Sequence, residues 1–477
     1  MISLDRRLVA VAVPLLLLTA CPEPTPAPAC GDLRSFDLSA CNQGTLNQVL
    51  LGGVFNTGIT WASGASSVSV INTVVQGAEK IDGRAATSKF VANGAFYFAL
   101  ATTEGGSQRR LAFAGCEGQS TFHVTGQAQS CVDGVKVDEG TFEAEWVDWG
   151  ANEMTFQNVA LVSETALQKG TASEVWVEGR WAYVAARTGG VVVFDVTAPA
   201  TPLLTARVEE TGDDWRDAKV FGNTLYVASQ KHGVIFYDVT NPAAPARLGQ
   251  VPADDVEVHS LELDPGTSRL FASSPAPTGE VLVFDISTPA SPNLRYRAQA
   301  TDVRGTSFFD SRMYVSQGAQ GLKVFAMPPA PLGAIPASAA GVASESSQAA
   351  SIGGRTVAFE GGEGWSGHVR ALDFTDPLAP SVLGEWSNGR PHQSMHHMQL
   401  VGTKLYLAHY QSGLRILDVS DPGQPTQTGY YNTWRPFDVG RGNNFYDSAM
   451  GVRVPGDGNI YVAESARGLM IFGETGP

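Results

Sequence analysis

The chain has 477 residues, with 47 acidic against 32 basic side chains and a formal net charge of −15. Only 17% of its residues are charged and 43% are hydrophobic, which excludes a chain disordered throughout and allows one large core or two moderate ones. The acidic balance, with no lysine or arginine cluster after the N-terminus, argues against DNA or RNA as a partner, because nucleic-acid binding relies on basic patches.

The first twenty residues have the pattern of an export signal. Arg6 and Arg7 precede an apolar run at residues 8–18. At about 11 residues this run is too short for the roughly 20 that a spanning helix needs. We therefore expect residues 1–20 to be a signal peptide.

The end of this segment carries a second motif. Residues 18–21 read Leu-Thr-Ala-Cys and resemble the lipobox of bacterial lipoproteins, in which the cysteine is lipidated and becomes the first residue of the mature chain. The resemblance implies a lipid on Cys21, followed by a Pro-rich tether over 21–29. Pro22 rather than Asp after the cysteine favours the outer membrane of the bacterial cell envelope. A plain secretory signal with an incidental cysteine is the alternative.

Export places the other cysteines in an oxidising compartment. Cys30, Cys41, Cys116 and Cys131 are even in number, so we expect two disulfides. Three pairings are possible, and we favour the local one, Cys30–Cys41 with Cys116–Cys131. A metal site is the alternative, but no Cys-x-x-Cys spacing supports it.

The cysteines also mark a domain, because none follows residue 131. Hydrophobicity alternates with a period of two at residues 67–70, 95–100, 121–124 and 141–147, with Gly-rich turns between them. Residues 30–157 are therefore predicted to form a small disulfide-stapled β-domain, a sandwich or a barrel. No chemistry is visible in it.

Internal repeats organise the rest of the chain. A short apolar strand that ends in Asp recurs at residues 191–195, 234–238, 281–285, 369–373 and 414–418, with degenerate copies at 322–326 and 469–473. Successive copies are 41 to 55 residues apart, which is the period of propeller blades. Seven copies predict a β-propeller, most simply seven-bladed.

Each copy also shares its flanking pattern. An aromatic strand such as residues 181–185 precedes the Asp-ended strand, and a Pro-x-x-Pro turn such as Pro199 and Pro202 follows it. A more polar fourth strand completes four antiparallel strands, with no room for a crossover helix. This pattern resembles the LVIVD repeat of bacterial secreted and lipoprotein β-propellers. The resemblance implies a propeller fold but no particular activity.

The last copy lacks a fourth strand. It reaches residue 473 only four residues before the end of the sequence, so residues 158–162 are predicted to supply that strand and close the ring. We therefore assign residues 158–477 to the propeller.

A histidine cluster is the most unusual constellation. His392, His396, His397 and His409 fall within 18 residues, and imidazole is the commonest ligand of Zn²⁺ or Cu²⁺. His396 and His397 are placed at the start of an innermost strand. The equivalent positions in other blades, which we expect to line one channel mouth, include Glu174, Asp217, His259 and Arg304. A polar channel lined by water-bound side chains, with no metal or other cofactor, is the alternative that we favour.

Motifs of catalysis are absent from the sequence. It has no Gly-x-Ser-x-Gly elbow, no phosphate-binding Gly-rich loop and no His-Glu-x-x-His. Trp215, Trp365, Trp386 and Trp434 lie near strand connections, where an aromatic rim can grip a protein or a glycan. The sequence therefore favours an envelope binding scaffold over an enzyme. A metal-binding protein or metal-dependent enzyme that uses the histidines is the alternative.

Overall fold

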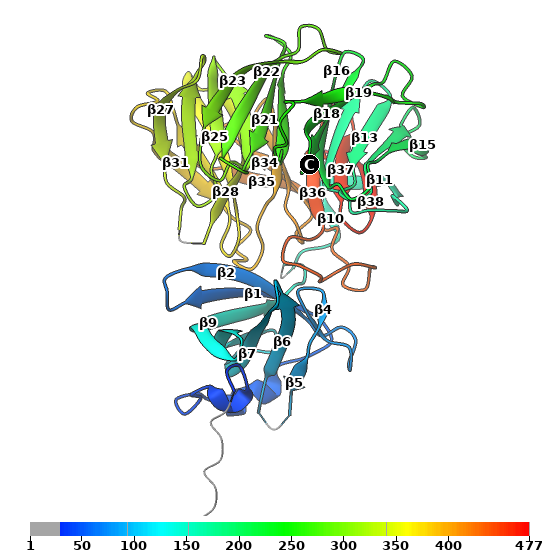
Figure 1. Cartoon of the computed structure of the whole chain (residues 1–477). Coiled ribbons are helices and arrows are strands. Elements are labelled where there is room, and N and C mark those ends of the chain that lie inside the picture. Colours follow the sequence, from blue (N-terminus) through cyan, green and yellow to red (C-terminus); the bar gives the residue numbers. More distant parts are fainter. Residues whose placement is uncertain (1–28, 93, 151, 340, 477) are drawn as a thin grey trace, which may run out of the picture.

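The computed structural model describes residues 29–92, 94–150, 152–339 and 341–476, and it is all-β, as predicted (Figure 1). The N-terminal part is one antiparallel sheet in the order β4-β3-β2-β1-β9-β8-β7-β6-β5, curved into a half-barrel. Its core includes Phe55, Phe98, Phe113 and Phe142. The elements are η1 (Leu33–Ser35), η2 (Gln43–Gln48), β1 (Val54–Trp61), β2 (Ser66–Asn72), β3 (Lys80–Ile81), β4 (Arg84–Ala85), β5 (Ser88–Phe90), β6 (Tyr97–Glu104), β7 (Ser107–Ser120), β8 (His123–Val132) and β9 (Val135–Trp146).

Two disulfides staple this sheet, but the predicted local pairing is wrong. The bridges are Cys30–Cys131 and Cys41–Cys116. β7 and β8 form a hairpin in which Cys131 lies opposite Arg110, far along β7 from Cys116. That separation is about 20 Å at 3.4 Å per residue, whereas bridged cysteines have Cα atoms within about 7 Å. The segment before β1 therefore runs along the hairpin and is bonded to it at two points.

Seven sheets follow around a central channel, one for each predicted repeat. The first four blades consist of β12 (Glu174–Glu178), β13 (Trp181–Ala185), β14 (Val191–Asp195) and β15 (Leu203–Val208); β16 (Trp215–Phe221), β17 (Thr224–Ser229), β18 (Gly233–Asp238) and β19 (Ala246–Val251); β20 (Ser260–Asp264), β21 (Arg269–Ser274), β22 (Glu280–Asp285) and β23 (Asn293–Gln299); and β24 (Gly305–Phe309), β25 (Arg312–Ser316), β26 (Leu322–Ala326) and β27 (Ala330–Ile335).

The remaining three blades complete the ring. They consist of β28 (Ala343–Ile352), β29 (Arg355–Glu363), β30 (Val369–Asp373) and β31 (Ser381–Trp386); β32 (His397–Val401), β33 (Lys404–Ala408), β34 (Leu414–Asp418) and β35 (Thr426–Tyr431), with β10 (Phe156–Gln157) added at the edge; and β36 (Ala449–Arg453), β37 (Ile460–Glu464), β38 (Gly468–Glu474) and β11 (Val159–Thr165).

β11 closes the ring as predicted. It pairs antiparallel with β38 from Val159, opposite Glu474, to Thr165, opposite Leu469. Val159 is fully buried in a cluster with Phe472. Strands from both ends of the propeller thus share the seventh blade and give it a full set of four strands.

The repeated aspartate has a local structural role. Asp195 accepts hydrogen bonds from the backbone N–H of Thr197 at 2.9 Å and from its hydroxyl, which hold the pKa of Asp195 below its usual range. The same bond to the residue two positions on recurs in four other blades, from Asp238, Asp285, Asp373 and Asp418. An Asx turn of this kind fixes the chain reversal into the outermost strand.

The half-barrel packs against one end of the propeller. Val54 and Val70 contact Trp434 and Phe445, which belong to a long connection between β35 and β36. We call this connection, residues 432–448, the mouth loop. The Asn56 side chain donates to the His392 carbonyl at 2.7 Å across the same junction. No helix among the described residues has the length and apolar character needed to cross a membrane.

Candidate functional site

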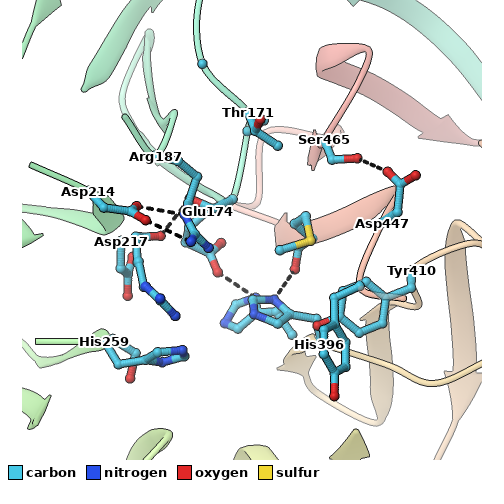
Figure 2. Close-up of a pocket in the computed structure, with 18 of the residues that line it drawn as sticks. Thr171, Glu174, Arg187, Asp214, Asp217, His259, His396, Tyr410, Asp447 and Ser465 are labelled. Carbon is cyan, nitrogen blue, oxygen red and sulfur yellow. Dashed lines mark hydrogen bonds and ion pairs between the residues drawn. The ribbon is translucent and has the colours of Figure 1, made fainter. Parts of the chain in front are cut away.

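The innermost strands and the mouth loop enclose a cavity of about 990 Å³ at the end of the channel that faces the half-barrel (Figure 2). Glu174, Asp217, His259 and Arg304, which the repeat register places at one mouth, all line this cavity, as do His396 and His397. They come together because each blade begins its innermost strand at the same height on the channel axis.

Asp217 and Glu174 occupy one wall. The Asp217 carboxylate accepts hydrogen bonds from Lys219 Nζ at 2.8 Å and from the Leu261 N–H at 2.7 Å. It therefore links its own strand to the innermost strand of the next blade. Glu174 accepts from the Val175 N–H at 2.9 Å. Burial, followed by the nearby Asp217 charge, raises the pKa of Glu174 to about 8, although the Lys219 charge opposes this rise. Asp217 therefore joins neighbouring strands of the channel wall, whereas the ionised form of Glu174 is disfavoured there.

Three histidines face the cavity from two sides. His397 Nδ1 lies 3.4 Å from Glu174 Oε2, whereas His396 and His259 turn toward Glu345. Burial lowers the pKa of His396 to about 4 and holds the pKa values of His259 and His397 well below the usual range. All three are therefore neutral imidazoles at pH 7, the form that binds metals.

The four histidines of the sequence cluster do not share one site. His392 is buried at the junction with the half-barrel, where its Nδ1 lies 3.0 Å from Glu145 Oε2. His409 is buried with its ring edge-on to Trp386, and burial lowers its pKa to about 3. The start of β32 places His396 and His397 at the channel. His392 and His409 instead pack at two separate buried positions.

Two carboxyl groups of the cavity were not identified from the sequence. Glu345 projects from a bulge in β28 between Ser344 and Ser346, and Glu363 ends β29. Glu363 accepts a hydrogen bond from the Tyr410 hydroxyl. Burial raises the pKa of Glu363 to about 7 and that of Glu345 well above its usual range. The sequence signal was weak, because β28 is longer than the other innermost strands and Glu345 lies in a bulge near its start, before the position that the repeat register counts.

The prediction that these tryptophans form an exposed rim is wrong. Trp215 and Trp434 are almost fully buried, at 1% and 2% exposed, and Trp365 packs against Gly58 of the half-barrel. Trp386 is partly buried against His409. Trp215 and Trp386 lie in strands and pack in blade cores, whereas Trp365 and Trp434 pack at the junction with the half-barrel.

The mouth loop instead presents apolar side chains to solvent. Phe437 is 78% exposed and Val439 is 94% exposed, and Val439 lies at the edge of the cavity. Tyr446, 38% exposed, also lines it. Exposed apolar groups beside a polar cavity are typical of binding surfaces.

These features define a seven-bladed β-propeller with a charged cavity at one channel mouth. Residues 169–210, 212–252 and 398–433, which cover the first, second and sixth blades, match the LVIVD repeat family. The chain is therefore a seven-bladed β-propeller in which three blades match the LVIVD repeat.

Other comparisons add little to this assignment. No curated protein matches the chain. Among solved structures it is similar to the crystal structure of the computationally designed Ika8 protein, with 9% identity, coverage of 76% of this chain and 93% of that chain, and a TM-score of 0.44.

Proposed function

We propose that this protein is an exported, lipid-anchored binding protein of the bacterial cell envelope, which holds a partner at the mouth of its propeller channel. The observation that carries the binding role is the pairing of a 990 Å³ charged cavity with a loop that exposes Phe437 and Val439. A cavity of this size accommodates a small ligand or the end of a larger one. The partner classes that fit are an envelope glycan or an envelope protein with a protruding segment.

Two observations support export and anchoring. The Cys30–Cys131 and Cys41–Cys116 bridges are characteristic of oxidising compartments. The lipobox-like cysteine, Cys21, lies outside the described residues, but η1, the first described element, is at the end of the half-barrel remote from the propeller (Figure 1). A lipid attached before it would hold the propeller away from the bilayer.

The anchor is tested by fractionating cells that express the wild type or Cys21→Ser. We expect the wild type in the outer-membrane fraction and labelled by radioactive palmitate. The variant should lose the label and leave the membrane. A wild-type protein that is unlabelled and fully soluble would overturn the anchored part of the proposal.

The binding role is tested with the purified protein against immobilised envelope glycan and, separately, against detergent-extracted envelope proteins. The double variant Phe437→Ser/Val439→Ser should weaken binding to one of these fractions at least about tenfold. Leu378→Ser is the matched control, because Leu378 is 72% exposed but belongs to the outer turn of the fifth blade. Equal binding by the mouth-loop variant and the control would reject the mouth as the binding surface.

The rival metal-dependent function makes a different prediction. A binding scaffold that uses the mouth loop keeps its partner when His396 becomes Asn, whereas a metalloenzyme that uses His396 loses its metal and its activity. Partner retention in this variant, measured in the same assay, supports the scaffold.

A further inference from the structure

Three metal-ligating side chains from three different elements meet on one wall of the cavity. They are Glu345 from the bulge of β28, Glu363 at the end of β29 and His396 just before β32. One donor atom from each lies within 4.8 Å of the other two. Glu345 and Glu363 are only 5% and 8% exposed, so their carboxyl groups are buried in the protein and do not form a solvated acidic patch.

The Glu345 carboxylate is unsatisfied. Its Oε2 is buried and accepts no hydrogen bond from any described residue. The nearby arginines form no direct ion pair with it, because Arg304 Nε donates to Asp302 at 2.8 Å and no described arginine nitrogen lies within ion-pair distance of Glu345. A buried carboxyl oxygen without a partner is costly, and a cation at this position would satisfy it.

The imidazoles that face Glu345 add an independent argument. His396 Nδ1 lies 2.7 Å from the Met450 carbonyl, and His259 Nδ1 lies 3.0 Å from the Arg304 carbonyl. A carbonyl oxygen only accepts, so each Nδ1 carries the hydrogen and each Nε2 of the neutral ring presents a lone pair.

Those lone pairs point at a carboxylate. His396 Nε2 lies 3.9 Å and His259 Nε2 lies 3.7 Å from Glu345 Oε1. Lone pairs that face each other in a buried wall repel unless a proton or a metal cation lies between them. A histidine fixed by a bond from Nδ1 to a backbone carbonyl, with Nε2 free, is also the usual arrangement of a metal ligand.

We propose that Glu345, Glu363 and His396 Nε2 bind one Zn²⁺ ion in this wall. Donor atoms of a tetrahedral zinc site lie about 3.3 Å apart. The donor atoms of Glu345, Glu363 and His396 reach that spacing if each side chain moves by less than about 1 Å. The donor set contains carboxylate and imidazole but no sulfur, which suits zinc and not Cu(I). The Tyr410 hydroxyl, which donates to Glu363, orients that ligand.

The fourth position faces the cavity. Three protein ligands and one open position are characteristic of zinc sites that engage an exogenous group. This inference rests on the proposed function in one respect, that the cavity is where the ligand binds. The group that the ion would bind there is an oxygen-bearing one, a carboxylate or a hydroxyl.

A second cluster, Glu210 with Asp213 and His232, carries no such inference. Asp213 Oδ2 already accepts from Trp215 Nε1 at 2.7 Å and from Ser229 Oγ at 2.5 Å. Glu210 pairs with Arg247 at 2.7 Å. Both carboxylates are thus satisfied by the fold.

The test is calorimetric titration of the purified, chelator-stripped protein with ZnCl₂. We expect one zinc per chain, and at least about 30-fold weaker binding for Glu345→Gln and for His396→Asn. Glu174→Gln and His397→Asn are the matched controls on the same cavity, and each should stay within about threefold of the wild type. Thermal melts without zinc check folding, and Glu345→Gln should melt no lower than the wild type because it removes one of two facing carboxylates.

Three results would overturn the site. They are no zinc binding by the folded wild type at millimolar concentration, wild-type affinity in Glu345→Gln, and an equal loss in Glu174→Gln. The titration contains no envelope ligand, so its failure refutes the zinc site alone. Zinc binding without any envelope binding refutes the proposed function alone.

Discussion

Replacing Glu174 with Gln should make the protein less sensitive to alkaline pH. Burial raises the pKa of Glu174 from 4.5 to about 8, so the folded state holds a proton that the unfolded state releases near pH 4.5. Below pH 4.5 both states are protonated and the raised pKa has no cost. As the pH rises from 4.5 through 8, the folded state is progressively disfavoured, and above 8 the loss is complete.

The size of this loss follows from the shift. At about 1.4 kcal/mol for each pH unit, the rise from 4.5 to about 8 corresponds to about 5 kcal/mol of unfolding free energy. For a domain of this size, about 2 °C of melting temperature accompanies each kcal/mol, so the full effect is about 10 °C. Glutamine keeps an acceptor for the Val175 N–H and cannot ionise, so the variant should escape this loss.

Differential scanning calorimetry between pH 5 and pH 9, with chelator present, measures the effect. The melting temperature of Glu174→Gln minus that of the wild type should be near zero at pH 5 and should rise by up to about 10 °C at pH 9. Glu178→Gln is the control, because Glu178 is exposed at the other end of β12. A difference that does not change with pH, or that falls as pH rises, would refute the assignment of Glu174 as a buried carboxylate whose ionisation opposes folding.

Three further outcomes are expected. Cys30→Ser/Cys131→Ser should lower the unfolding free energy of the half-barrel by about 3 to 4 kcal/mol in denaturant titrations, because the remaining Cys41–Cys116 bridge shortens the loop that the lost bridge closes to segments of 11 and 15 residues; a loss below about 1 kcal/mol would contradict this. Trp434→Ala should cost about 3 to 5 kcal/mol and increase proteolysis between the two domains, because the ring is 2% exposed at their junction; unchanged proteolysis would show that the junction does not depend on it. Phe437→Ser should leave the melting temperature within about 1 °C of the wild type, because the ring is 78% exposed; a large drop would show that this ring is part of a core.

Repetition explains how much of the propeller the sequence predicted. Each blade is specified by local signals, such as the Asp195 turn onto Thr197, and five strict copies of one local signal outweigh two degenerate copies, such as the one that ends in Ala326. The closing strand was predictable because the last repeat lacks one strand. Glu174 and His259 were placed at the cavity because their positions count from a strand that recurs in every blade.

What the sequence could not decide depends on contacts between elements that no repeat relates. The cysteine pairing follows from the length of the β7–β8 hairpin, which separates Cys116 from Cys131. His392 and His409 are close to His396 along the chain, but only His396 of these three lies at the start of a strand that faces the channel. The turns on either side of that strand bury His392 at the junction and His409 against Trp386.

The proposed zinc site is the clearest case of this division. Sequence periodicity determined the seven blades, their strand order and the row of residues at the channel mouth, because those features arise within about 45 residues of chain. Only the tertiary structure brought Glu345, Glu363 and His396 together. A bulge displaced the first, a strand end placed the second and a neighbouring blade supplied the third, and such a meeting is set by the packing of the ring and not by any spacing along the chain.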